Sequence, residues 1–100
     1  MIRGTTPTHT FTIPFEVSEI KTVKITYAQD DVVVCEKTMS DCELTGTTIS
    51  TVLTQEDTFK FDHTKDVQIQ LRILTISGQA LASIVEKVGV SRCLDDEVLQ

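Results

Sequence analysis

The chain has 100 residues, a formal net charge of −6 at pH 7 and a sequence pI near 4.7. A chain of this length forms one domain and can bury roughly 60–70% of its unfolded surface, which is enough for a single core. Its nine Lys and Arg residues are scattered among fifteen Asp and Glu residues. Because nucleic-acid backbones and anionic membranes bind clustered cations, we expect neither of them as a partner.

Two features of the sequence bear on its compartment. The opening "MIRGTTPTHT" has no apolar stretch after its arginine, and the longest purely apolar run is "VVVC". We therefore expect no signal peptide and no membrane-spanning segment, and a cytoplasm as the place of synthesis. Cys35, Cys42 and Cys93 are odd in number and show no C-x-x-C spacing, so we expect three unpaired thiols and no zinc site.

Hydrophobic residues alternate along the chain with a period of two, which is typical of strands with one buried face. The clearest case is "VQIQLRI", in which the apolar residues from Val67 to Ile73 share one face. The pattern predicts seven strands, at about 8–15, 20–27, 31–37, 42–44, 47–53, 66–76 and 79–90. Short, evenly spaced strands joined by tight turns indicate an all-β fold, an antiparallel immunoglobulin-like β-sandwich of about seven strands.

Two strands carry irregular features. Pro14 falls inside the first strand, which predicts an edge position or a bulge there. The last strand, after the Ser77-Gly78 turn, contains apolar residues in one phase that Glu86 interrupts, so a bulge or a rim position is expected at Glu86. The residues in that phase are Ala80, Ala82, Ile84, Val88 and Val90.

The strand phases also predict the core and the limits of the domain. We expect the core to contain Phe11, Ile13, Phe15, Val23, Ile25, Leu53, Phe61, Val67, Ile69, Leu71 and Ile73. We expect the sandwich domain to span residues 8–90, between a loose Thr-rich N-terminal arm (residues 1–7) and an acidic and apolar C-terminal tail (residues 91–100).

The stretch "TFKFDHTKD", residues 58–66, follows Glu56 and Asp57 and is the densest group of ionisable residues in the chain. One interpretation is a structural corner. Thr54 and Asp57 fit a capping box, which predicts a single helical turn. Residues 57–61 also resemble loosely the Asp-Thr-Ala-x-Tyr connection of immunoglobulin-like domains, with Phe61 as the corner aromatic. We expect Phe59 and Phe61 to fill the end of the core.

The other interpretation of this stretch is a metal or acid–base site. A catalytic zinc ion usually requires three protein ligands, and only His63 is nearby, because His9 lies in the first strand. A calcium loop requires a glycine turn, which "DHTKD" lacks. The chain also contains no phosphate-binding glycine loop and no G-x-S-x-G motif. We therefore favour the structural corner. We expect no catalytic residue, no metal site and no cofactor, and we expect that the protein is not an enzyme.

Four segments together resemble a known family: "RGTTPTHTF", "LTQEDT", "VQIQLRILT" and "CLDDEVL". They are similar to small proteins encoded in phage and prophage genomes of Gram-positive gut bacteria, among the virion structural genes. The resemblance covers nearly the whole chain. It implies a virion structural or assembly protein, made in the cytoplasm of a host bacterium and then part of the virion, and it brings no functional residues with it.

The expected function is therefore non-enzymatic assembly through protein–protein contacts, with itself or with other virion proteins as partners and a homo-oligomer as one form. The candidate partner-binding residues lie in the tail, where apolar side chains flank an acidic cluster: Leu94, Asp95, Asp96, Glu97, Val98 and Leu99. The tail either packs on its own domain or docks on a neighbouring subunit. The alternative function is an immunoglobulin-like binding module that recognises a host-surface glycan or protein.

Overall fold

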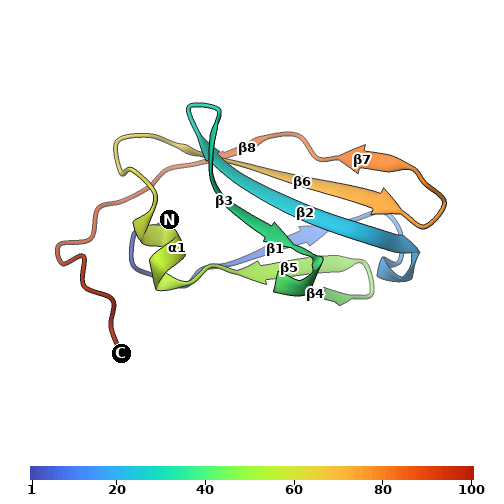
Figure 1. The fold of residues 1–100 in the computed structure, drawn as a ribbon, viewed down its shortest axis with the longest axis horizontal. Helices are drawn as coiled ribbons and strands as arrows, with labels where there is room; N and C mark the ends of the chain where they lie inside the picture. Colours follow the sequence, from blue (N-terminus) through green and yellow to red (C-terminus); the bar gives the residue numbers. More distant parts are fainter.

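The computed structural model describes all residues from Met1 to Gln100, and it consists of two antiparallel sheets that face each other (Figure 1). One sheet has the order β1-β5-β4, with β1 at Thr8–Thr12, β5 at Thr48–Val52 and β4 at Cys42–Thr45. The other has the order β3-β2-β6-β7, with β3 at Val32–Thr38, β2 at Ile20–Gln29, β6 at Val67–Thr75 and β7 at Ala80–Ala82. An eighth strand, β8 (Glu86–Val88), also pairs with β6.

Three short helical turns carry the chain from one sheet to the other. They are η1 (Val17–Glu19) between β1 and β2, η2 (Met39–Asp41) between β3 and β4, and α1 (Gln55–Phe59) between β5 and β6. Hairpins join β2 to β3, β4 to β5 and β6 to β7, and β8 follows β7 as a second partner of β6. None of the helical segments is long or apolar enough to cross a membrane.

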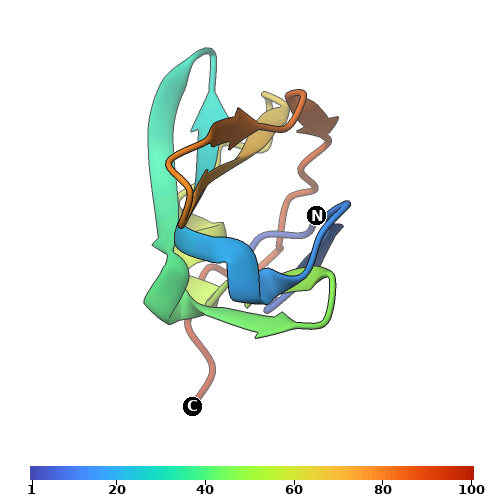
Figure 2. The ribbon, with the colours of Figure 1, turned by 90° about the vertical axis from the view of Figure 1, so that its right-hand side faces the viewer.

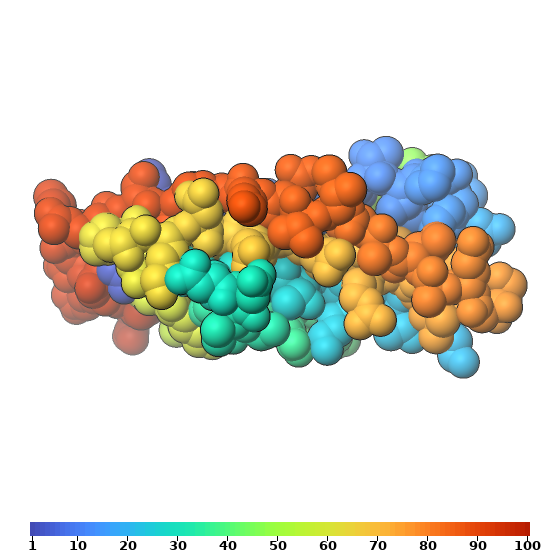
Figure 3. All heavy atoms as spheres, turned by 90° about the horizontal axis from the view of Figure 1, so that it is seen from above, coloured from blue at the N-terminus to red at the C-terminus, as the bar shows by residue number.

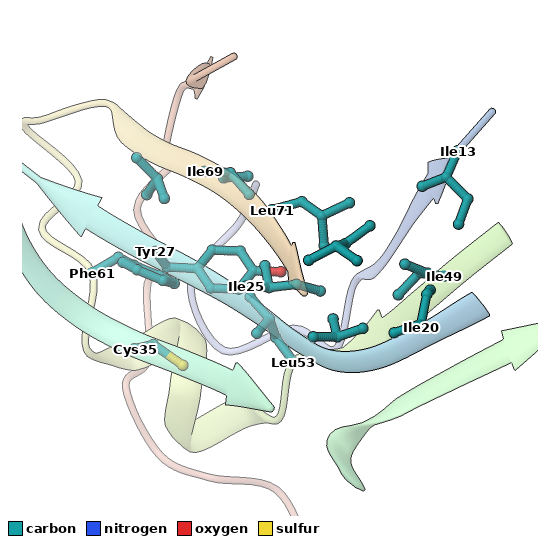
Figure 4. Packing of buried hydrophobic residues seen from close by; sticks show 13 residues of the cluster. Ile13, Ile20, Ile25, Tyr27, Cys35, Ile49, Leu53, Phe61, Ile69 and Leu71 are labelled. Atoms are coloured by element: carbon teal, nitrogen blue, oxygen red, sulfur yellow. The ribbon is translucent and has the colours of Figure 1, made fainter. Parts of the chain in front are cut away.

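The core lies between the two sheets and follows the alternation of the strands (Figure 4). Nine of the eleven core residues expected from the sequence are buried, whereas Phe11 and Phe15 are only half-buried. Ile20, Tyr27, Cys35 and Ile49 complete the buried cluster. The two half-buried phenylalanines lie next to one side of the sandwich that nothing covers.

The first strand is shorter than predicted. Its ladder with β5 ends as the Ile13 amide donates to the Thr47 carbonyl (2.8 Å), and Pro14, which has no amide proton, follows at once. The strand has no second neighbour, which confirms the edge position that Pro14 predicts.

The last strand differs more from its prediction. It is divided into β7 and β8, and Leu81 is the half-buried residue of β7, while Ala80 and Ala82 are exposed. The expected phase was therefore wrong for β7, and Ile84, at 78% exposed, lies in neither strand. At the break, the Leu71 amide of β6 donates to the Ser83 hydroxyl (2.9 Å) instead of to a main-chain carbonyl. A side chain that replaces a carbonyl in the ladder ends regular pairing.

The N-terminal arm is not loose, contrary to the expectation for residues 1–7. The Met1 ammonium group donates to the Gly89 carbonyl (2.9 Å), and main-chain bonds join Arg3 to Ser91 and Ser91 to Met1. The first residues therefore run beside the segment that follows β8. These partners lie almost a full chain length apart, so no local pattern announces the pairing.

Candidate functional site

The C-terminal tail follows this N-terminal pairing and lies at the end of the elongated molecule that also holds α1 (Figures 1 and 3). Polar contacts hold it there. The Arg3 guanidinium forms an ion pair with Asp96 (3.0 Å), and the Gln55 side chain exchanges two hydrogen bonds with the main chain of Leu99 (3.0 and 2.8 Å). The tail therefore touches its own domain, but through surface groups.

The apolar residues of the tail are not used by these contacts. Leu94 is 94% exposed and Leu99 is 74% exposed, while Val98 is half-buried. The acidic residues between them point to solvent, apart from the Arg3–Asp96 pair and an Asp95 carboxylate that accepts from the Glu97 amide (2.9 Å). The six candidate residues are thus contiguous and exposed for the most part, with two leucines left in water.

Asp57, directly before the stretch of ionisable residues at 58–66, is a structural residue. It forms the capping box with Thr54 that the sequence predicts, and it also accepts from the Lys37 ammonium at 2.7 Å. Burial alone would raise the pKa of this carboxyl, but the hydrogen bonds from Lys37 and Thr54 lower it to about 2. Asp57 is therefore ionised at neutral pH and fastens α1 to β3.

The loop from Asp62 to Asp66 is held by Gln29 of β2. The Gln29 amide group donates to the carbonyls of Asp62 and Lys65 (2.7 and 3.0 Å), and its oxygen accepts from the Asp62 amide (2.9 Å). The Asp62 carboxylate accepts from the amide and the hydroxyl of Thr64, which lower the pKa of Asp62. His63 and Asp66 are exposed. No group of three or more His, Cys, Asp or Glu side chains gathers here or elsewhere in the structure.

Of the two corner phenylalanines, Phe61 fills the core position expected from the sequence, whereas Phe59 is half-buried and lies outside the core cluster. Phe61 is 1% exposed and packs near Tyr27, with ring centroids 6.1 Å apart. Phe59 lies under the N-terminal arm, where the Arg3 guanidinium sits 5.4 Å from its ring centre. The corner therefore joins the end of the core to the arm.

The histidine of the first strand contacts a tyrosine. His9 Nδ1 lies 2.7 Å from the hydroxyl of Tyr27, which is fully buried. Burial and the nearby N-terminal ammonium group lower the pKa of His9, and burial raises the pKa of Tyr27. His9 thus serves as the hydrogen-bond partner of a buried hydroxyl.

All three cysteines are free. Burial raises the pKa of the Cys35 and Cys42 thiols.

A groove of about 490 Å³ opens on the side of the sandwich between β1 and β7. Half-buried Phe11 and Phe15 and the buried Ile13 line it from the β1 end, and Leu81 lines it from β7. Leu71 and Ile73 of β6 form its floor. In the space-filling view the blue segment that contains the end of β1 lies beside the orange segment that contains β7 (Figure 3). None of the eleven lining residues is charged.

Both strands that flank this groove have an unpaired edge. β1 pairs only with β5, and β7 pairs only with β6. Their sequences, "THTFT" and "ALA", contain no acidic or basic residue other than His9. The opposite side differs, because there η2 carries the chain directly from β3 to β4 (Figure 2). The groove and its two edges are therefore a second candidate surface, far from the tail.

Comparison with protein-family models, with curated proteins and with solved structures found no match to this chain. The candidate surfaces therefore have to be judged on their own geometry.

The sequence pointed to one of the two surfaces and missed the other. The tail was recognised because its apolar residues flank an acidic cluster without a strand pattern. The groove was missed because Phe11, Ile13, Leu71 and Ile73 look like ordinary core residues in the sequence. Their only local signal was Pro14, which predicts an edge strand but not which side of the sandwich stays open.

Proposed function

We propose that this protein is a non-enzymatic structural or assembly protein of a phage virion. It works by contact with copies of itself or with other virion proteins, and it is built on an immunoglobulin-like sandwich. The resemblance of its sequence segments to phage-encoded proteins supports the virion context.

The sheet topology supports the immunoglobulin-like assignment. In that fold the second strand of the chain pairs with the fifth, and the third pairs with the sixth, across two sheets. The pairs β1–β5 and β2–β6 match this arrangement if β1 takes the place of the second strand. β4 then corresponds to the fourth strand, β3 to the extra strand beside the third, and β7 with β8 to the seventh. The first strand of the standard fold has no counterpart of full length.

The exposed tail is the observation that carries the assembly role. An apolar side chain left in water forgoes roughly 1.5–3 kcal/mol of burial. Leu94 and Leu99 are 94% and 74% exposed on a segment that polar contacts already hold in place. A partner surface that covers them would recover this free energy without any rearrangement of the domain.

Deleting residues 93–100 tests this role. We expect the full chain to form assemblies larger than one subunit, by light scattering and native mass measurement, and the deletion to reduce their size. The thermal melt should change little, because the polar contacts of the tail to its own domain are exposed and Cys93 and Val98 are only half-buried.

A double variant separates the leucines from the rest of the tail. Leu94→Ser with Leu99→Ser keeps the Arg3–Asp96 pair and the main-chain bonds of Leu99 to Gln55, and it should reduce assembly as the deletion does. Val32→Ser is the matched control, because Val32 is 66% exposed on β3, outside the tail, and this variant should leave the size unchanged. A full chain that stays monomeric, or a deletion that leaves the size of the assembly unchanged while the melt falls sharply, would contradict the proposal.

A further inference from the structure

The free edge of β1 presents a regular set of unused main-chain groups. His9, Phe11 and Ile13 are the residues that exchange hydrogen bonds with β5, as the bond from the Ile13 amide to Thr47 and the one from Leu53 to the Pro7 carbonyl show. Alternate residues of a strand point their main-chain groups to opposite sides. The amides and carbonyls of Thr8, Thr10 and Thr12 therefore face away from the sheet.

This edge is complementary to itself. An antiparallel pair centred on Thr10 places Thr10 opposite Thr10 of a second copy, and Thr8 opposite Thr12 of that copy. All three positions have free groups, so the pair makes about six main-chain hydrogen bonds. On the inner face His9 meets Phe11 of the second copy, twice, in the close cross-strand positions where aromatic rings gain contact.

Two prolines limit the register of this pairing. Pro7 and Pro14 bracket β1, and Pro14 has the same parity as the free-edge residues but no amide proton to donate. A shift by two residues toward Pro14 would therefore lose hydrogen bonds. The pairing centred on Thr10 uses every free donor of the strand.

The charged residues on each edge strand indicate which edge of the molecule fits a second copy. Each copy carries a net charge of −6, so two copies repel each other except where no charge is presented. The edge strand β3 carries Glu36 and Lys37, and the edge strand β4 carries Glu43. Charged side chains on an edge oppose pairing with another sheet. β1 and β7 both lack such charges, but β7 has only three residues, whereas β1 has five and therefore offers more main-chain groups beside a groove with no charged lining residue.

The groove adds apolar area to this contact. Phe11 and Phe15 are half-buried at its rim, together with Leu81. A second copy that continues the β1-β5-β4 sheet would extend over this rim and cover the phenylalanines. Main-chain pairing and apolar burial therefore favour the same position of the second copy.

We propose that two copies of this chain pair through β1 in a two-fold antiparallel arrangement centred on Thr10, which joins their three-stranded sheets into one sheet of six strands. This contact deepens the assembly role proposed above, on which it rests, and it is independent of the tail.

Disulfide cross-linking tests the register. In a Cys93→Ser background, which removes the thiol of the tail, Thr10→Cys should give a covalent dimer under mild oxidation. The Cα atoms of directly opposed residues lie about 5.5 Å apart, within the range that a disulfide spans. Thr12→Cys is the matched control on the same strand and face. Its two thiols would lie roughly 14 Å apart in this pairing. It should therefore not cross-link, whereas Thr8→Cys combined with Thr12→Cys should.

A proline tests the main-chain contact. Thr10→Pro removes an amide that the sheet does not use, so the monomer should keep its circular dichroism spectrum, and the dimer should weaken roughly tenfold or more. Thr10→Val keeps the amide and should leave the dimer unchanged.

The outcomes separate this contact from the role of the tail. The pairing through β1 is overturned if Thr12→Cys cross-links as strongly as Thr10→Cys, or if neither variant cross-links. This holds even if the tail deletion reduces the size of the assembly as proposed. Selective cross-linking at Thr10 supports the pairing even if the tail deletion has no effect, which would contradict only the role of the tail.

Discussion

The two sides of the sandwich differ, because the chain closes one of them and leaves the other partly open. On one side η2 carries the chain from β3 to β4, and the Lys37–Asp57 ion pair fastens β3 to α1. On the other side no connection joins β1 to β7 (Figure 2). There, the pairing of Met1–Arg3 with Gly89–Ser91 covers the end near α1, and the groove beside Phe11 occupies the remainder.

The difference bears on the contact between two copies that we propose. The closed side is protected by a covalent connection and by charged edge residues, so it needs nothing else. The open side keeps an uncharged edge, an apolar groove and unused main-chain groups. A protein that assembles is expected to leave this kind of surface open and to protect the others.

The largest expected effects on the free energy of unfolding come from leucines in the core between the sheets. Leu53→Ala and Leu71→Ala should both fall in the roughly 2–5 kcal/mol range for buried leucines. Leu53 is 0% exposed, so its removal leaves an enclosed cavity, and the cost should lie near the upper end. Leu71 already borders the groove, so its cost should lie near the lower end.

Urea denaturation of the two leucine variants measures this difference. Equal costs would show that the groove floor is packed as tightly as the rest of the core. A cost for Leu71→Ala below about 0.5 kcal/mol would show that this residue is not part of the core at all.

The ionic link on the closed side is expected to have the next largest effect. Asp57→Asn removes the charge that Lys37 and the Thr54 amide bind, and it should lower the free energy of unfolding by roughly 1–3 kcal/mol. Because the folded-state pKa of Asp57 is lowered from 3.8 to about 2, its contribution is present above pH 4 and is lost as the pH falls toward 2.

Chemical denaturation at a series of pH values checks this expectation. The stability difference between wild type and Asp57→Asn should shrink between pH 4 and pH 2. Asp41→Asn, at the exposed capping box of η2, is the matched control and should have a smaller effect at neutral pH. A constant difference across this pH range would contradict the role of the charge.

The packing of the N-terminal arm on Phe59, at one end of the open side, should make a moderate contribution to stability. Gly4 has a φ of +80°, and a Cβ atom there would lie 2.5 Å from the Phe59 ring. Gly4→Ala should therefore cost about 1–3 kcal/mol, since it combines backbone strain with displacement of the ring. Gly46 has a φ of +58°, and a Cβ atom there would have no neighbour within 4 Å, so Gly46→Ala should cost less. Thermal melts that rank the two variants in the opposite order would show that the arm is not packed on Phe59.

The smallest effect is expected for the ion pair between the arm and the tail. The Asp96 side chain is 62% exposed, and exposed pairs contribute about 0–1 kcal/mol. Asp96→Asn should therefore change the melt only slightly, and less so at high salt. A loss comparable to that of Asp57→Asn would show that the tail belongs to the stable part of the domain.

Local patterns predicted much of this structure because they depend on neighbours in the chain. The Thr54–Asp57 capping box needs only residues three apart, and the buried face of β6 follows from the alternation of Val67 to Ile73. The same method failed at the last strand. There the pairing register places Leu81 opposite buried Ile73, so Leu81 faces inward in place of Ala80 and Ala82. The ladder is then interrupted where the Leu71 amide donates to the Ser83 hydroxyl.

The amino-acid sequence by itself determined that this chain forms strands with one buried face, a capped turn before Phe61 and an edge position for the first strand beside Pro14. Each of these follows from the period of two, from a local hydrogen bond or from a missing amide proton. Only the tertiary structure decided that the N-terminal arm pairs with Ser91 and that the groove beside Phe11 stays open. These features depend on main-chain groups and sheet edges brought together from distant parts of the chain, and such contacts leave no periodic trace in the sequence.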